Sequence, residues 1–177
     1  MLNTKIKPFN TISYFNKKFY NINLNDLKNK WNIFFFFPYS FTFICPTELK
    51  DISNYNLKFK EKNCNLFAIS TDSHYTHKKW IESELTFINF PFISDFNKLI
   101  SKNFNIYNKK DGNCERSTFI LDKNLNIKYI EILDNNIGRS IHNIYQKLIM
   151  MQFTYKNINK LCPFSWNNDN KAIDINL

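Results

Sequence analysis

The chain lacks any long hydrophobic run. Its longest uninterrupted apolar stretch, Ile33 to Phe37, is far shorter than the roughly 20 residues that a membrane-spanning helix needs. The N-terminal residues 1–8 contain no apolar core of the kind that secretory signals carry, so we expect neither a signal peptide nor a membrane partner. The expected setting is a reducing cytoplasm, where the four cysteines predict reactivity rather than a disulfide scaffold.

Glycine is almost absent, with 2 in 177 residues, and no Ser/Gly linker, internal repeat or charge block divides the chain. A chain of this length with 44% hydrophobic residues fits one globular domain with a sizeable core. We expect a main domain over residues 1–158 and a C-terminal segment over 159–177. Asn, Lys, Ile, Phe and Tyr are abundant and share A/T-rich codons, so this composition indicates mutational bias.

Acidic residues are few relative to basic ones, 15 against 24, which gives a net charge of +9. Such a charge raises the question of nucleic-acid binding. The lysines are scattered as isolated pairs, for example at 17–18, 78–79 and 109–110, whereas a binding stripe clusters them and places aromatics between. We therefore attribute the charge to the same mutational bias and expect no nucleic-acid partner.

Short apolar runs alternate with segments whose apolar residues recur at helical spacing. The runs predict strands over 34–37, 65–70, 90–93, 117–121 and 127–132. The helical spacing predicts helices over 44–59, 74–84, 98–104 and 140–157, and the stretch from residue 160 has no regular pattern. Together they indicate an α/β fold with a mixed central sheet flanked by helices.

Cys45 lies where a buried strand gives way to a helix. Pro38 ends the apolar run, because proline has no N–H to donate to a neighbouring strand. The helical spacing begins at Ile44, which places Cys45 in the first turn, where unpaired N–H groups and the helix dipole stabilise a thiolate. Thr42 is placed to cap this turn and to hydrogen-bond the sulfur. The pattern predicts an activated sulfur nucleophile.

Arg116 is a candidate partner for that thiolate. It directly precedes the strand predicted over 117–121, and its guanidinium would stabilise a nearby sulfur anion and polarise an oxygen substrate. On the residues alone, a surface arginine at the start of a strand is the simpler interpretation.

Two other chemistries have weaker support. A thioredoxin-like disulfide reductase needs Cys-x-x-Cys, and here the fourth position is Glu48. His74 and His77 stand three apart on a predicted helix, as a metal pair does, but no third ligand at suitable spacing is evident, so a structural role is favoured.

The remaining thiols differ in their sequence context. Cys64 precedes a buried strand and is interpreted as an inert core thiol. Cys114 stands two residues from Arg116, so an off-pathway disulfide is conceivable there, although structural neutrality is favoured.

Several short motifs follow one another in order along nearly the whole chain. They are Asn3 to Phe9, Pro38-x-x-x-Thr42-x-x-Cys45-Pro-Thr-Glu48, Ser70 to Trp80, Arg116 to Phe119, Ile137-Gly-Arg139 and Cys162-Pro-Phe-Ser-Trp166. This ordered set resembles the typical 2-Cys peroxiredoxins, most closely the peroxidase subunit of bacterial alkyl hydroperoxide reductase. The resemblance implies a thioredoxin-like fold with peroxiredoxin additions and no metal, haem or flavin.

The resemblance also implies a role for each matching residue. Cys45 matches the peroxidatic cysteine, and Cys162 matches the resolving cysteine near the C-terminus. The other matches are Thr42 as the hydroxyl that contacts sulfur and peroxide, Pro38 as the shield of the pocket, Arg116 as the active-site arginine, Glu48 as the acid that holds the arginines, and Arg139 as structural support.

The implied activity is the reduction of hydrogen peroxide and organic hydroperoxides to water and alcohols. A sulfenic acid forms on Cys45, Cys162 of a partner subunit resolves it, and a flavoprotein disulfide reductase or a thioredoxin recycles the disulfide. The implied assembly is a homodimer, often in a ring of dimers such as a decamer. An alternative is a chaperone-like ring with weakened peroxidase activity, since heavy asparagine use and scarce glycine are compatible with a drifting sequence.

Family members that are easily inactivated by peroxide carry a Gly-Gly-Leu-Gly loop and a Tyr-Phe-containing C-terminal helix. The matching loop here, Lys109 to Arg116, has a single glycine, and the tail from Ala172 to Leu177 has no Tyr-Phe. The resemblance therefore implies resistance to overoxidation.

Overall fold

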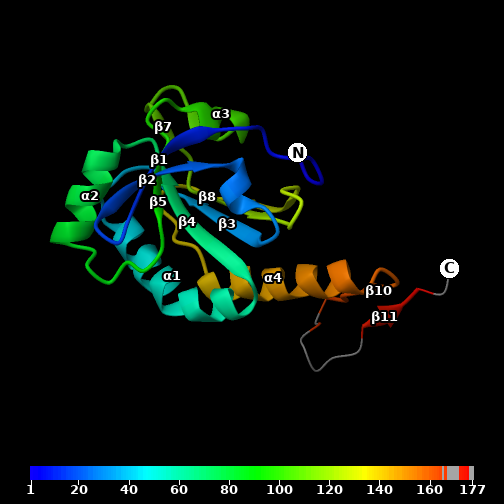
Figure 1. The fold of residues 1–177 in the computed structure, drawn as a ribbon. Helices are drawn as coiled ribbons and strands as arrows, with labels where there is room; N and C mark the ends of the chain where they lie inside the picture. Colours follow the sequence, from blue (N-terminus) through cyan, green and yellow to red (C-terminus); the bar gives the residue numbers. More distant parts are fainter. Residues whose placement is uncertain (165, 167–171, 176–177) are drawn as a thin grey trace. The chain divides into compact units, whose positions relative to one another are not determined.

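The computed structural model describes residues 1–164, 166 and 172–175 (Figure 1). The chain divides into two compact units, residues 1–139 and 140–177. The first unit contains the central sheet, and the second contains a long helix with the C-terminal segment. The long helix that begins after residue 140 thus groups with the C-terminal segment in the structure. The boundary expected from the sequence lies after residue 158, just past the end of this helix. None of the described helices is both long and apolar enough to cross a membrane.

A mixed sheet of seven strands forms the centre of the first unit, in the order β2-β1-β5-β4-β3-β8-β9. Strand β4 pairs in parallel with β3 and β5, and the other neighbours are antiparallel. The prediction of a mixed sheet is confirmed. The strands are β1 (Asn10–Phe15), β2 (Lys18–Asn23), β3 (Trp31–Phe36), β4 (Cys64–Ser70), β5 (Phe92–Ser94), β8 (Ser117–Leu121) and β9 (Ile127–Ile132).

Three α-helices of this unit lie close to their predicted bounds. Ser73 caps α2, because its side chain accepts a hydrogen bond from the N–H of Thr76 at 3.1 Å. Helix α1 packs against β4, and α2 packs against β1 and β5. The helices are α1 (Ile44–Glu61), α2 (His74–Ser83) and α3 (Leu99–Asn103), with a short 3₁₀ helix η1 (Leu24–Leu27) and a two-stranded ribbon of β6 (Tyr107–Asn108) and β7 (Asn113–Cys114).

Strand β3 is buried along its whole length because both faces of the sheet are covered. Phe34 and Phe36 point to one face, where their rings lie 5.8 and 5.4 Å from that of Phe104, which follows α3. Phe35 points to the other face, and the guanidinium carbon of Arg139 lies 5.4 Å from its ring centre. Figure 1 shows α3 and α1 on opposite sides of the sheet. The uninterrupted run of phenylalanines is therefore core, as the sequence predicted.

The N-terminal hairpin of β1 and β2 was not predicted. Its two strands are joined by Asn16 and Lys17, both with positive φ (48° and 60°), as in a tight two-residue hairpin turn. Strand β2 is exposed over its first four residues, so it carries no alternating apolar pattern that would reveal a strand.

Left-handed backbone positions fall mostly on asparagine in this glycine-poor chain. Nine described residues other than glycine have positive φ, and five of them are Asn3, Asn16, Asn29, Asn63 and Asn105. Asparagine tolerates this conformation because its short polar side chain can hydrogen-bond locally.

The second unit contains α4 (Ile141–Lys156), where the Ser140 side chain accepts a hydrogen bond from the Asn143 N–H at 3.4 Å. Two short strands, β10 (Lys160–Leu161) and β11 (Ile173–Asp174), pair antiparallel in the stretch that the sequence left without a pattern. The ring of Trp166 lies 4.9 Å from that of Phe153.

Candidate active site

Cys45 is the second residue of α1, in the first turn of the helix as predicted. Its side chain is buried, with 1% of the residue exposed. The free N–H groups at the start of the helix and the positive end of its dipole favour a negative charge at this position. The local structure thus places the sulfur at the positive end of the helix, where bulk solvent does not reach it.

The predicted cap of this helix is wrong. Phe43 occupies the N-cap position, and no side chain caps the helix there. The hydroxyl of Thr42 instead donates to the carbonyl oxygen of Tyr39 at 3.0 Å. A hydroxyl has one hydrogen, so Thr42 does not also donate to the Cys45 sulfur in this conformation.

Arg116 lies beside the sulfur because of the sheet topology. Strand β8 runs antiparallel to β3, with Ser117 opposite Phe36, so the residue before β8 lies beside the exit of β3 that leads into α1. The Nη2 of Arg116 lies 3.6 Å from the Sγ of Cys45 and also donates to the carbonyl oxygen of Asn135 at 2.9 Å. Arg116 is 2% exposed, so little solvent screens its charge from the sulfur.

Glu48 lies one helical turn after Cys45 and binds two arginines. Its Oε2 accepts from Nη1 of Arg116 and from Nη2 of Arg139, the latter at 3.0 Å. Its Oε1 accepts from the backbone N–H and the Nε of Arg139 at 2.7 and 2.9 Å. Burial acts to raise the pKa of Glu48, but the hydrogen bonds and charge of Arg139, with the charge of Arg116, outweigh it and hold that pKa below its ordinary value.

The guanidinium group of Arg116, next to the sulfur, and that of Arg139 bind one carboxylate directly. Glu131 is a second acidic group near Arg139, and burial raises its pKa and so favours its neutral form. Arg116 also has a buried Nε–H for which the described residues supply no hydrogen-bond acceptor. The cluster therefore suits a sulfur anion and retains one donor that an added oxygen atom could satisfy.

Sequence reasoning missed one residue of this arrangement. Asn135 accepts from the backbone N–H of Arg116 through Oδ1 at 3.2 Å, in addition to the bond at its carbonyl. It lies in the loop after β9, and a single asparagine in an asparagine-rich chain carries no signal that would single it out. The structure thus brings together Cys45, Glu48, Arg116 and Arg139, and places Thr42 and Pro38, which is buried, in the segment that leads to the helix.

The other thiols lie in different surroundings. Cys64 and Cys114 are buried, and burial raises the pKa of each thiol well above its ordinary value. The Sγ of Cys114 donates to the carbonyl oxygen of Phe37 at 3.2 Å, as expected of a structurally neutral thiol. Cys162 belongs to the second unit, where its Sγ lies 3.8 Å from the carbonyl oxygen of Met150. Its partial burial raises the pKa of the Cys162 thiol.

The two histidines of α2 are not directed at a common ligand. His77 is fully buried with Nε2 at 2.7 Å from Ser70 Oγ, whereas the ring of His74 lies 5.1 and 4.2 Å from those of Phe19 and Tyr75. Across the part of the chain that the structure describes, no three metal-ligating side chains gather at one point.

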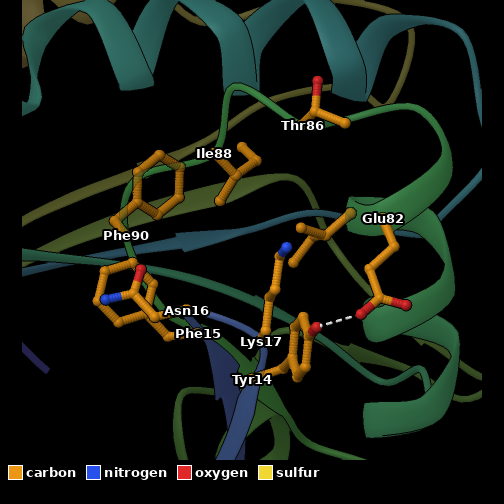
Figure 2. Close-up of a pocket in the computed structure, with 9 residues that line it drawn as sticks. Tyr14, Phe15, Asn16, Lys17, Glu82, Thr86, Ile88 and Phe90 are labelled. Atoms are coloured by element: carbon orange, nitrogen blue, oxygen red, sulfur yellow. Dashed lines mark hydrogen bonds between the residues drawn. The ribbon is translucent and has the colours of Figure 1, made fainter.

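A hollow of about 650 Å³ lies elsewhere, between the tip of the β1–β2 hairpin, the end of α2 and the loop that follows (Figure 2). The hydroxyl of Tyr14 donates to Glu82 there at 2.6 Å, and burial, with the hydrogen bond and charge of Glu82, raises the pKa of Tyr14 to about 12. None of the predicted site residues lines this hollow.

Comparisons with known proteins agree on one family. The family model described as the AhpC/TSA family matches residues 3–130. Alkyl hydroperoxide reductase C of Escherichia coli strain K12 is 34% identical over 94% of this chain and 90% of its own length, and that of Bacillus subtilis strain 168 is 33% identical over the same shares. Among solved structures, Enterococcus faecalis AhpC superposes with a TM-score of 0.89 at 35% identity, covering 92% of this chain and 98% of its own. The reduced 2-Cys peroxiredoxin of Plasmodium vivax gives a TM-score of 0.91 at 27% identity, covering 97% and 91%.

Proposed function

This chain belongs to the AhpC/TSA family and is a peroxiredoxin, and we propose that it reduces hydroperoxides at Cys45 with Arg116 as the residue that polarises the peroxide. The observation that carries the proposal is the buried guanidinium of Arg116 at 3.6 Å from the Cys45 sulfur. Its unpaired Nε–H supports the same role, because a buried donor normally finds an acceptor and a peroxide oxygen would supply one.

In the first step the Cys45 thiolate attacks one oxygen of the peroxide. A sulfur–oxygen bond forms and the O–O bond breaks, so sulfur is oxidised to a sulfenic acid while the other oxygen leaves with the electron pair. That oxygen takes up a proton and departs as water or an alcohol. The Arg116 guanidinium stabilises the charge that develops on it, and Glu48 holds the guanidinium in place.

In the second step we propose that Cys162 of a partner subunit attacks the sulfenic sulfur. A disulfide forms and water leaves, after which a dithiol reductant, a flavoprotein disulfide reductase or a thioredoxin, donates two electrons to restore both thiols. All four cysteines are free thiols in the structure. The assembly that would supply the partner is a homodimer within a ring of dimers.

Peroxide consumption in the presence of dithiothreitol tests the proposal. The natural chain should consume hydrogen peroxide and cumene hydroperoxide, and Cys45→Ser should lose this activity. Cys162→Ser is the matched control, because in a single turnover without dithiothreitol it should still reduce about one equivalent of peroxide per chain. A natural chain that performs no better than Cys45→Ser would contradict the function. None of the features described above favours the chaperone-like ring.

A further inference from the structure

The segment 38–43, between β3 and α1, is tied to the loop after β4 through one carboxylate. We propose that Asp72, oriented by the buried pair Ser70 and His77, is a positioning residue that holds this segment closed during the peroxide step and limits its opening for disulfide formation. The proposal rests on the peroxidase function proposed above. The segment carries Pro38 and Thr42 and has no regular secondary structure of its own.

The tie consists of two hydrogen bonds to one oxygen of Asp72. The backbone N–H of Ser40 donates to Oδ2 at 2.8 Å, and Ser70 Oγ lies 2.9 Å from the same atom. The backbone of Asp72 is itself fixed, because its N–H donates to Ser70 Oγ at 3.1 Å and its carbonyl accepts from Ser94 Oγ at 2.7 Å. Asp72 therefore joins a rigid strand end to an irregular segment.

His77 is in hydrogen-bond contact with the Ser70 hydroxyl. Its Nε2 lies 2.7 Å from Ser70 Oγ, and its buried ring packs against those of Phe37 and Phe92 at 5.9 and 5.5 Å. Burial lowers the pKa of His77 to about 4, so the ring is neutral near pH 7 and carries one hydrogen. With that hydrogen on Nε2, His77 donates to Ser70, and the only hydrogen of the Ser70 hydroxyl is free to bind Asp72.

The segment needs such a tie because its backbone is strained. Phe41 has a φ of 58°, in the left-handed region that is unfavourable for a bulky residue. Side chains attach the segment as well: the Phe41 ring lies 5.7 Å from that of Trp80, and the Tyr39 hydroxyl donates to the carbonyl oxygen of Asp111 at 2.5 Å. Loss of the bond to Asp72 would let this strain relax by opening the segment.

Opening has opposite consequences for the two chemical steps. The peroxide step needs an ordered segment before the helix, because this segment leads directly into the first turn that holds the buried sulfur of Cys45. The disulfide step needs the reverse, because Cys45 is 1% exposed and a thiol from another subunit cannot approach it until the first helical turn opens. A loosened segment should therefore slow the first step and speed the second, whereas a general loss of structure would slow both.

Asp72→Ala, compared with Asp72→Asn, tests the tie. In stopped-flow experiments we expect Asp72→Ala to slow sulfenic-acid formation about tenfold and to speed disulfide formation severalfold. Asp72→Asn retains an oxygen that can accept from Ser40 and should restore most of both rates. Asp51→Ala makes the same charge change at an exposed position of α1 and should leave both rates unchanged.

The His77 contribution is tested by a second pair of variants. His77→Gln keeps an N–H donor near the position of Nε2 and should preserve both rates, whereas His77→Met removes the donor and should shift both rates in the direction of Asp72→Ala. If the two rates fall together in Asp72→Ala, or if neither changes, the positioning role is overturned.

Hydrogen exchange separates failure of this inference from failure of the peroxidase function. In the reduced protein, with no peroxide present, Asp72→Ala should increase amide exchange in segment 38–43, the Ser40 amide above all, and Asp51→Ala should not. Unchanged exchange would refute the tie even in an active enzyme. A natural chain that does not consume peroxide but shows this increase would refute the function and leave the tie supported.

Discussion

Oε1 of Glu48 accepts two hydrogen bonds from Arg139, from the backbone N–H at 2.7 Å and from the side-chain Nε at 2.9 Å. This double attachment fixes the carboxylate against the loop after β9, so that its other oxygen faces Arg116. One helix side chain thereby sets the position of the guanidinium that lies against the Cys45 sulfur.

We expect Glu48→Gln to destabilise the protein by about 3–5 kcal/mol, because it leaves two buried guanidinium groups without a carboxylate. It should also slow the peroxide step, since Arg116 loses its anchor. Urea unfolding and stopped-flow kinetics measure the two effects.

The stabilisation by Glu48 should depend on pH, because the pKa of Glu48 is lower in the folded state than in the unfolded state. The stabilisation is complete above the unfolded pKa of about 4.3 and is lost as the pH falls through the folded pKa. A stability advantage over Glu48→Gln that does not shrink in acid would contradict this.

Arg116→Ala should reduce the second-order rate of sulfenic-acid formation by about 10²–10³-fold, the usual cost of losing one donor to developing charge. Arg116→Lys should recover only part of this rate, because an ammonium group cannot bind Glu48 and the peroxide with the geometry of a guanidinium. Lys50→Ala, which removes a positive charge from the exposed side of α1, is the control. Equal rates for all three variants would exclude Arg116 from the peroxide step.

The stability of the protein should depend on pH through His77. Its folded pKa of about 4 lies below the unfolded value of about 6.5, so the unfolded state binds more protons and stability falls as the pH decreases between these values. From pH 7 to pH 5 the free energy of unfolding should fall by about 2 kcal/mol more in the natural chain than in His77→Gln. Parallel urea titrations at the two pH values measure this difference, and equal losses would show that His77 is not the group that titrates.

Oxidation should produce a disulfide-linked dimer. Cys162 lies in the second unit, far along the chain from Cys45, and its thiol is only partly buried. Peroxide treatment followed by a non-reducing gel should show a dimer band that disappears in Cys45→Ser and in Cys162→Ser. An oxidised monomer with an internal disulfide would show that the resolving thiol comes from the same subunit.

Disulfide formation should become faster with increasing pH, because burial raises the pKa of Cys162 and the attacking species is its thiolate.

Cys45 should resist overoxidation. The loop over 109–116 has a single glycine, Gly112, where easily inactivated family members carry Gly-Gly-Leu-Gly, so mass spectrometry should detect little Cys45 sulfinic acid at moderate peroxide. Sulfinic acid that accumulates at low peroxide while reductant remains would refute this resistance.

The sequence predicted those parts of the fold whose pattern reports burial directly. Strand β3 reads as a continuous apolar run because both of its faces are covered, and α1 has the spacing of a helix with one buried side. The hairpin was missed because β2 is largely exposed. The cap was misassigned because the positive φ of Phe41 turns the chain before the helix begins, and sequence spacing cannot show this.

The site was predictable only in part for a related reason. Cys45 and Arg116 stand in recognisable motifs, whereas the ties of Asn135 to Arg116 and of Asp72 to Ser40 join loops that are distant in the sequence. Such contacts depend on where the loops end in space, and no local pattern encodes that.

The asparagines at left-handed turns have a consequence for how this protein tolerates sequence change. Glycine is the usual residue at tight turns with positive φ, yet five such positions here are occupied by asparagine, which tolerates this conformation better than most residues. The turns of the scaffold that carries Cys45 therefore rely on asparagine rather than on glycine. Replacing these asparagines with glycine one at a time should be close to neutral for folding, which makes the turns permissive places to begin reshaping the chain.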